Sequence, residues 1–493
     1  MTEFRKSGSL KDKVARGVAW SVAEKVGSML LQMAVSLIIL RLLTREDFGI
    51  MAILTAVSAV ALVLVDSGFS QMLIRKEDLD ERDCKSVFFF NIAVSLALYL
   101  LFLLLTPVAA RYYEMPELVE LAPIFFLLLP VNALCSVQNA LFVRQFRFAL
   151  LSKITFVSAL VSGLLAVGLA LAGAGVWSVV LQRLMQVVVR VALLWRLGEW
   201  RPRGRFDGRA LRQMAPYSFS LMATDLITTF YNKIPQFALG RLYPADTLGA
   251  FDQAVKLKDQ PVTSAMQAVQ SVTFPALSKL GNDPQKFAES YRQVVMVVTY
   301  LLSPIMLGLS AVSRDLFAAL LGEEWMPTVP YFEVVCFAGL FYPIAMVAFN
   351  VLKARSDGKI IVRIELLKKI LMTLIFAFTI PFSVEAVVWG LVAISFCEMV
   401  VNVGASLRYT TLKWLSLLRT LLPIVAVSGA MYLSVCVVLQ LLPFEAWLRL
   451  LIGVLTGVVC YPMLSAIFRL EAFHEVIAIL CKQLKINKPD RNC

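Results

Sequence analysis

The stretch LRLLTREDFGI, residues 40–50, returns in altered form as GRLYPADTLGA at residues 240–250. The two copies lie 200 positions apart, and their alignment needs no gap. The matched residues are Arg41 with Arg241, Leu42 with Leu242, Glu46 with Asp246, and Gly49 with Gly249. Each copy joins the end of one apolar segment to the start of the next. The match therefore predicts that the chain contains two related halves.

Long apolar segments flank both copies and recur along the whole chain. Hydrophobic residues make up 59% of the 493 residues and charged residues 16%, whereas a soluble domain carries about 25% charged residues. Apolar runs of about 20 residues are long enough to cross a bilayer as helices. Fourteen such spans are expected at residues 17–40, 47–66, 86–106, 118–140, 154–174, 176–195, 215–239, 247–275, 291–313, 328–350, 363–383, 385–407, 417–441 and 446–468. The sequence predicts an all-α integral membrane protein with about fourteen transmembrane helices.

Basic residues divide unevenly between the loops on the two sides of the expected membrane. The net charge is +13, and most of the 47 Lys and Arg residues lie in alternate loops and in both termini. The opposite loops hold only Arg41, Arg45, Arg111, Arg241, Arg314 and Arg449. Because basic loops stay in the cytoplasm, both termini are expected there. The basic run at residues 195–212 is expected beside anionic lipid headgroups, and nucleic acid is not an expected partner.

The repeat and the spans together predict the domain organisation. Since an even number of spans separates the two copies, both halves share one orientation, related by a pseudo-two-fold axis along the membrane normal. The expected parts are an N-terminal lobe at 1–200, a basic cytoplasmic linker at 201–214, a C-terminal lobe at 215–410, two further helices at 411–470, and a cytoplasmic tail at 471–493. Parallel repeats of this kind are one architecture of transporters that work by alternating access.

Polar residues recur at spacings of three and four inside the expected spans, so each set lies on one helix face. A charge within hydrocarbon costs about 2.5–3.5 kcal/mol on insertion scales, and such residues usually face protein or water. The sets include Lys25 in the first span, Arg183 and Arg190 in the sixth, Asp225, Asn232 and Gln236 in the seventh, and Asp252, Lys256, Asp259, Thr263 and Gln267 in the eighth. Stripes in both halves predict a water-filled central cavity.

A second interpretation of these stripes is structural. Lys256 lies one turn from both Asp252 and Asp259, so it can pair with either carboxylate and join helices without binding a ligand. Lys368 and Lys369 in the eleventh span can extend their charged ends to the cytoplasmic surface. Both interpretations remain open at the level of sequence.

The chain lacks the motifs of common enzymes. It contains no G-x-x-x-x-G-K-[ST] phosphate loop, no G-x-S-x-G turn and no H-E-x-x-H pair, so no ATPase, hydrolase or zinc protease is indicated. Neither catalytic residues nor a metal site are expected, and no outside loop is long enough to form a catalytic domain. The protein is therefore not expected to be an enzyme or to hold a cofactor.

Several short segments carry a family resemblance, in an order and spacing that are specific together. They are Gly17 and Trp20, LRLLTREDFGI, DSGFSQMLIRKEDLD (66–80), Arg190 ahead of WRPRGRF (200–206), LGRLYPADTLGAFDQAVKLKDQPV (239–262), FPALSKLGND (274–283), LGEEWMPTVP (321–330) and SVEAVVWG (383–390). On these residues the chain resembles the Wzx-type polysaccharide exporters, in the colanic-acid-exporter-like branch of the MOP superfamily.

The resemblance implies a MATE-like fold and a flippase that moves polyprenyl-pyrophosphate-linked oligosaccharides across the bacterial inner membrane. Such a substrate needs cations for its pyrophosphate, and Arg suits phosphate through its fork of donors. The expected headgroup residues are Arg190, Arg183, Lys25, Lys233 and Lys256, and the expected cavity and sugar contacts are Asp225, Asn232, Gln236, Asp252, Asp259, Thr263 and Gln267. Where relatives often have an acidic residue after YNK, this chain has IPQF (234–237), which leaves coupling to a proton or sodium gradient open.

Three alternatives remain. A MATE-like drug or cation antiporter would share the fold and carry a smaller substrate. A membrane glycan polymerase or ligase would need catalytic groups that the sequence does not provide. A scaffold for other polysaccharide-assembly proteins would tolerate substitutions in the cavity. Such proteins are also candidate partners of a flippase.

Overall fold

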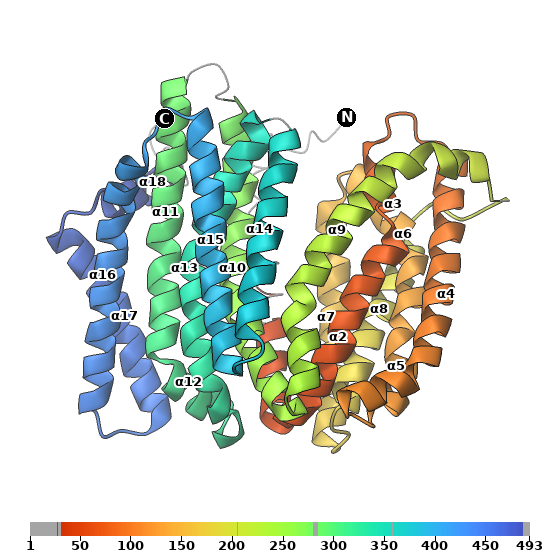
Figure 1. Ribbon diagram of the computed structural model, residues 1–493, viewed down its shortest axis with the longest axis horizontal. Coiled ribbons are helices and arrows are strands. Elements are labelled where there is room, and N and C mark those ends of the chain that lie inside the picture. Colours follow the sequence, from red (N-terminus) through yellow and green to blue (C-terminus); the bar gives the residue numbers. More distant parts are fainter. Residues whose placement is uncertain (1–26, 28–30, 205, 280–283, 357, 487–493) are drawn as a thin grey trace, which may run out of the picture. The chain divides into compact units, whose positions relative to one another are not determined.

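The computed structural model describes residues 27, 31–204, 206–279, 284–356 and 358–486 of the 493. These residues form helices, turns and loops, and no strand occurs among them. Contacts divide the chain into two compact units, Met1–Gly249 (unit 1) and Ala250–Cys493 (unit 2), whose helices are labelled in Figure 1. The all-α class predicted from the sequence is confirmed.

Unit 1 is built of long helices and two short ones, Phe69–Arg75 and Leu118–Phe126. They are, in chain order, a helical segment at Leu31–Leu42, then α2 (Arg45–Asp66), α3 (Phe69–Arg75), α4 (Glu81–Tyr113), α5 (Leu118–Phe126), α6 (Leu128–Arg144), α7 (Phe148–Leu171), α8 (Trp177–Leu197), α9 (Gly208–Leu242) and the start of α10 (Ala245–Lys279). Helix α6 packs against α4 and α8, α8 packs against α7, and α9 packs against α2.

Unit 2 contains the rest of α10 and the helices that follow it. They are α11 (Pro284–Ala311), α12 (Ser313–Leu320), the 3-10 helix η1 (Glu323–Thr328), α13 (Val329–Arg355), α14 (Gly358–Thr379), α15 (Val384–Ser406), the 3-10 helix η2 (Leu407–Tyr409), α16 (Trp414–Leu441), α17 (Ala446–Ile467) and α18 (Glu471–Ile486). Helix α13 packs against α11 and α15, and α16 packs against α11 and α17. Figure 1 shows α16 and α17 joined as an antiparallel pair.

Polar caps fix where two long helices of unit 1 begin. At the start of α2, the Thr44 side chain accepts a hydrogen bond from the backbone N–H of Asp47, whose carboxylate accepts one from the N–H of Thr44. Asp80 and Asp83 form the same reciprocal arrangement at the start of α4. Because the first N–H groups of a helix have no partner within it, these side chains satisfy donors that would otherwise be unpaired.

The repeated stretch forms a close crossing between α2 and α10 inside unit 1. A Cβ atom on Gly49 would lie 1.8 Å from the carbonyl oxygen of Ala245, and one on Gly249 would lie 1.9 Å from that of Arg45. The contact is reciprocal, since these residues correspond at the 200-residue offset of the repeat. Arg45 Nη1 also lies 3.5 Å from Asp246 Oδ2. Glycine is therefore required where the two copies touch.

The stretch at residues 66–80 makes a tight turn, helix α3 and the loop to α4. Gly68 has a φ of 73°, and a Cβ atom on it would lie 2.3 Å from the carbonyl oxygen of Ser218 on α9. Arg144, at the end of α6, donates a hydrogen bond to the carbonyl oxygen of Leu73 at 3.0 Å. The turn is thus fixed on α6 and α9 by one glycine and one arginine.

Buried polar contacts join the helices of unit 2. The hydroxyl of Tyr291, on α11, lies 3.0 Å from that of Ser406 at the end of α15. Ser303 of α11 and Ser428 of α16 form a hydrogen bond of 2.8 Å. Small polar side chains that pair across helices are a common means of holding transmembrane helices together.

Ten helices of the described chain are long and apolar enough to cross a membrane. They are α2, α4, α5 with α6, α7, α8, α11, η1 with α13, α15 with η2, α16 and α17. Many large apolar side chains on them are exposed, among them Leu104 and Leu441, which suits contact with lipid. The multi-pass membrane protein predicted from the sequence is confirmed.

Helix α9 belongs to unit 1 by its contacts, because it packs against α2, α3 and α4. The sequence instead divides the lobes at the linker of residues 201–214, before this helix. The predicted lobe boundaries rest on the sequence repeat, whereas the two units rest on contacts, so the lobe boundaries stay a prediction.

Candidate functional site

Arg190 is held between two helices of unit 1. It lies on α8, is half-buried, and donates a hydrogen bond from Nη2 to Oδ1 of Asn139 on α6 at 2.9 Å. Its Nε is buried and has no hydrogen-bond partner among the described residues. The guanidinium is therefore positioned by a neutral amide, and it retains both its charge and donors for a further anion.

Arg183 lies on the same helix, seven residues earlier, and is exposed. The two arginines that the sequence placed on one helix face therefore differ in environment. Arg190 is half-buried and bonded to Asn139 of α6.

The polar residues of α9 are also unequal. Asp225 and Asn232 are exposed, Lys233 is half-buried, and Gln236 is buried. Gln236 precedes the close approach of α9 to α2, where a Cβ atom on Gly240 would lie 2.5 Å from Ile53. The stripe therefore runs from an exposed end to the packed contact with α2.

The charges of α10 in unit 2 pair with one another. Lys256 Nζ lies 2.5 Å from Oδ2 of Asp252, whose side chain is 2% exposed, while that of Lys256 is 37% exposed. Asp259 lies 2.5 Å from Nζ of Lys258, and its backbone carbonyl accepts a hydrogen bond from Thr263 at 2.8 Å. The pairing of Lys256 with Asp252 expected from the structural interpretation is present. The carboxylate of Asp259 is instead paired with the adjacent lysine.

Lys368 of α14 is buried. Its Nζ lies 2.5 Å from Glu365 Oε1 and 4.9 Å from the centre of the Phe349 ring. Glu398, on α15, lines the same small void as Lys368. The expectation that Lys368 reaches the cytoplasmic surface is wrong, because a carboxylate and an aromatic face hold it inside unit 2.

The predicted site residues fall into two sets. Unit 1 contains Arg183, Arg190, Asp225, Asn232, Lys233 and Gln236, and unit 2 contains Asp252, Lys256, Asp259 and Thr263. Lys25 lies outside the described residues, and so does the side chain of Gln267. Their convergence on one cavity stays a prediction.

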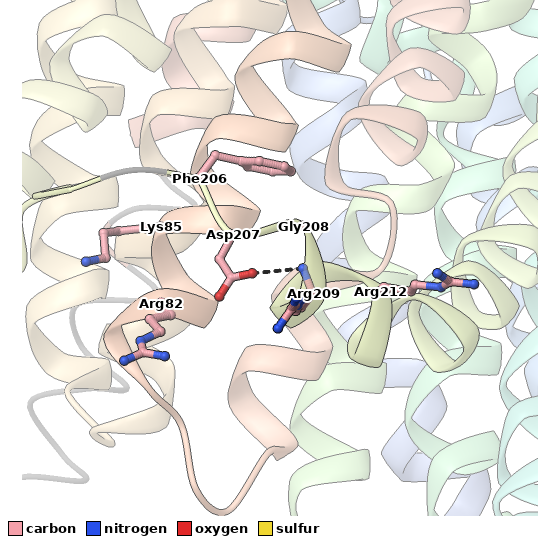
Figure 2. A pocket seen from close by; sticks show the side chains of 7 residues that line it. All are labelled: Arg82, Lys85, Phe206, Asp207, Gly208, Arg209 and Arg212. Carbon is pink, nitrogen blue, oxygen red and sulfur yellow. Dashed lines mark hydrogen bonds between the residues drawn. The ribbon is translucent and has the colours of Figure 1, made fainter.

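A basic pocket in unit 1 was missed by the sequence analysis. It has a volume of about 690 Å³ and is lined by Arg82, Lys85, Phe206, Asp207, Gly208, Arg209 and Arg212, as Figure 2 shows. The basic run at residues 195–212 indicated one wall of it. The other wall is the start of α4, more than a hundred positions away in the chain, and no sequence pattern links the two.

Two ion pairs of unit 2 involve carboxylates outside the candidate spans. Arg292 donates to both carboxylate oxygens of Glu471, at 2.8 and 2.6 Å, and this contact lowers the pKa of Glu471 below its ordinary value. Asp315 of α12 lies 3.3 Å from Arg449 Nε. Burial raises the pKa of Asp315, and the charge of Arg449 opposes that shift. These pairs attach α18 to α11 and α12 to α17.

Three curated proteins of bacterial polysaccharide pathways are similar to this chain. The succinoglycan biosynthesis transport protein ExoT of Rhizobium meliloti is 28% identical over 63% of this chain and 63% of its own length. The teichuronic acid biosynthesis protein TuaB of Bacillus subtilis is 24% identical over 92% of this chain and 95% of its own. The lipopolysaccharide biosynthesis protein WzxC of Escherichia coli is 22% identical over 74% of both chains.

Two solved structures share the fold. The lipid II flippase MurJ, in an inward closed conformation, aligns with a TM-score of 0.71 at 13% identity, over 92% of this chain and 98% of its own. An inward-facing multidrug resistance MATE family transporter of the MOP superfamily aligns with a TM-score of 0.57 at 15% identity, over 80% of this chain and 96% of its own. These alignments establish the MOP-like fold.

The sequence model of one family matches most of the repeat-containing part of the chain. It covers residues 38–330 and is described as polysaccharide biosynthesis protein. The match includes the repeated stretches, α8 with Arg190, and the whole of α9 and α10. The chain therefore belongs to the polysaccharide biosynthesis protein family.

Proposed function

We propose that this protein is a flippase that moves polyprenyl-pyrophosphate-linked oligosaccharides across a bacterial inner membrane for export of a surface polysaccharide. The observation that carries the proposal is the family match over residues 38–330 in a chain with the fold of a lipid II flippase. The lipid tail of such a substrate can remain in the bilayer, while its sugars and pyrophosphate need a polar path. No enzymatic step is required for that movement.

The proposed membrane layout has fourteen spans with both termini in the cytoplasm. Besides the ten candidate spans, it counts the segment at Leu31–Leu42 together with α9, α10 and α14, each of which overlaps an expected span. The last three carry the polar residues of the predicted cavity or buried charges, and this lowers their hydropathy. The two lobes would rock between inward-open and outward-open states.

Arg190 is the residue that we assign first to the pyrophosphate. It is fixed on Asn139 at 2.9 Å, it has no carboxylate within 4.0 Å among the described residues, and charge-assisted bonds to phosphate are strong. Arg183, Lys233 and Lys25 are further candidates for the same charge. Asp225, Asn232 and Gln236 are assigned to sugar hydroxyls, as are Asp259, Thr263 and Gln267. Lys256 is assigned to Asp252, its partner at 2.5 Å, as a structural pair.

A drug or cation antiporter is the second candidate, since a multidrug transporter of the MOP superfamily shares the fold at a TM-score of 0.57. The match to the polysaccharide biosynthesis protein family favours the flippase. An antiporter would give drug resistance when expressed in a sensitive strain and would not restore polymer export.

The test is genetic and uses the natural polymer. Deletion of the gene is expected to stop export and to leave lipid-linked units on the cytoplasmic leaflet, and wild-type protein restores export. The Arg190→Ala variant, at equal protein level, is expected to fail, while Arg196→Ala, an exposed residue of the same helix, restores export. Normal export by Arg190→Ala would remove this residue from the site. Normal export by the deletion strain would overturn the proposed function. Collapse of the proton or the sodium gradient in the strain that carries wild-type protein identifies any coupling ion.

A further inference from the structure

The basic pocket lies where helices of unit 1 begin. Arg82 and Lys85 stand on the first turns of α4, and the opposite wall is residues 206–212, which lead into α9. Figure 2 shows the four basic side chains arranged around the segment from Phe206 to Gly208. Helix α4 is a candidate span, so its first turns lie at the edge of the bilayer.

Asp207, the only carboxylate among the described residues that line the pocket, is already engaged. Asp207 caps α9 by accepting a hydrogen bond from the N–H of Arg209 at 2.9 Å, and its own N–H donates to the hydroxyl of Ser86 at 3.1 Å. The first bond fixes the start of α9, and the second holds the linker against α4. Four cations against one acid leave the lining with a net charge of +3.

Two further acids lie beside the pocket at longer range. Asp80 lies 3.6 Å from Arg82 Nε, and Glu81 lies 3.9 Å from Lys85 Nζ. Both distances exceed those of charge-assisted hydrogen bonds. Among the described residues, no carboxylate forms an ion pair within 4.0 Å of the guanidinium nitrogens of Arg209 or Arg212. The positive charge is therefore only partly compensated by the protein.

Lys85 and Phe206 give the basic pocket a defined geometry. The Lys85 side chain is only 13% exposed, and a Cβ atom on Gly204 would lie 3.1 Å from its Nζ, so the linker holds this ammonium in place. Phe206 is 51% exposed at the rim. An aromatic ring beside cations at the end of a span suits a ligand that has an anionic head and an apolar chain.

We propose that this pocket binds the phosphate of a membrane lipid headgroup. The shared chemistry is a phosphate ester at the bilayer surface, and its source is either the bulk anionic phospholipid or the diphosphate of the carrier lipid. The site is distinct from the residues assigned to the transport path, because Arg190 is not part of its lining.

The test is lipid binding to the purified full-length protein in nanodiscs, measured by native mass spectrometry. The probes are phosphatidylglycerol, undecaprenyl diphosphate, phosphatidylcholine as a neutral headgroup, and inorganic phosphate as competitor. Wild-type protein is expected to bind one or both anionic lipids more tightly than phosphatidylcholine, and the lipid that binds identifies the source. Because each basic residue near an anionic surface contributes on the order of a fivefold gain, Arg209→Gln with Arg212→Gln is expected to weaken binding about 30-fold.

The matched control is Arg203→Gln, an exposed linker residue outside the pocket lining, which is expected to bind as wild type. Export by Arg190→Ala tests the transport path, and lipid binding by Arg209→Gln with Arg212→Gln tests this pocket, so failure of the proposed function and failure of this site are separate results. The melting temperature of each variant without added lipid reports folding. Equal lipid binding by the double variant and the wild type would overturn the proposal. Full displacement of lipid by inorganic phosphate at equal concentration would overturn it as well.

Discussion

The charged residues of α8 in unit 1 and of α10 in unit 2 have different partners. Arg190 is held by the neutral amide of Asn139 at 2.9 Å, whereas Lys256 is held by the carboxylate of Asp252 at 2.5 Å. A carboxylate neutralises its partner, and an amide positions it without removing its charge. A charged residue in a span is therefore a stronger candidate for an anionic ligand when its partner in the protein is neutral.

The largest expected effect is on transport by Arg190→Ala. Hydrogen bonds to charged groups contribute about 1.5–3 kcal/mol, so loss of this guanidinium is expected to slow flipping about 10- to 100-fold. Asn139→Ala should give a smaller loss, since it keeps the charge and removes its support. The rate is measured as export of polymer at equal protein level. If Asn139→Ala were more damaging than Arg190→Ala, the amide rather than the arginine would be the ligand contact.

The pair on α10 should behave in the opposite way, with an effect on stability. Lys256→Met leaves the carboxylate of Asp252 without its lysine, and a buried group that loses its partner costs about 1–3 kcal/mol. The double variant Lys256→Met with Asp252→Leu is expected to regain most of that loss, because an apolar pair often replaces a buried ion pair without cost. Thermal unfolding of the three variants forms a double-mutant cycle. Additive losses would show that Lys256 has another role.

The glycine crossing is the place where the two copies of the repeat should behave alike. An added methyl on Gly49 or on Gly249 would meet a carbonyl oxygen within 2 Å, and overpacking costs about 1–3 kcal/mol. We expect Gly49→Ala and Gly249→Ala to lower the unfolding temperature by similar amounts. Gly173→Ala, where no atom lies within 4 Å but φ is +81°, is a control for backbone strain without a steric clash. A large difference between the two crossing variants would contradict the reciprocal contact.

The smallest expected effect comes from the ion pair between Arg292 and Glu471. The pKa of Glu471 is lowered in the folded protein by Arg292, so its contribution to stability is present above the ordinary carboxylate pKa and is lost as the pH falls through the lowered value. Because Glu471 is largely exposed, the contribution should stay below about 1 kcal/mol. Glu471→Gln is expected to unfold earlier than wild type at pH 7 and equally in acid. A difference that persists in acid would contradict an ionic origin.

Contacts within one helix could be predicted from the sequence, and contacts between distant segments could not. The pairing of Lys256 with Asp252 follows from a spacing of four on one helix. Asn139 lies 51 positions from Arg190, and no periodicity connects them. The same limit applies to Lys368, whose burial depends on Phe349 of another helix.

The fold could be predicted from the sequence more fully than the site, for a related reason. Apolar runs of span length report a membrane helix directly, and the offset of 200 positions reported the repeat. The offset did not indicate that Gly49 packs against Ala245 of the second copy and that Gly249 packs against Arg45 of the first. A matched glycine in the sequence shows only that the position repeats. The carbonyl oxygen that requires a glycine there belongs to another helix, and the two meet only in the folded protein.

The most direct test of the account is a flipping assay with purified protein in vesicles. A lipid-linked oligosaccharide is placed in one leaflet, and its arrival in the other is followed with a membrane-impermeant lectin. We expect transfer by wild type and by the Lys256→Met, Asp252→Leu double variant, and a 10- to 100-fold slower transfer by Arg190→Ala, on the order of the loss of one charge-assisted bond. Transfer by Arg190→Ala at the wild-type rate would contradict the role of Arg190 in the transport path, and loss of transfer in a stably folded double variant would contradict the structural role of the α10 pair.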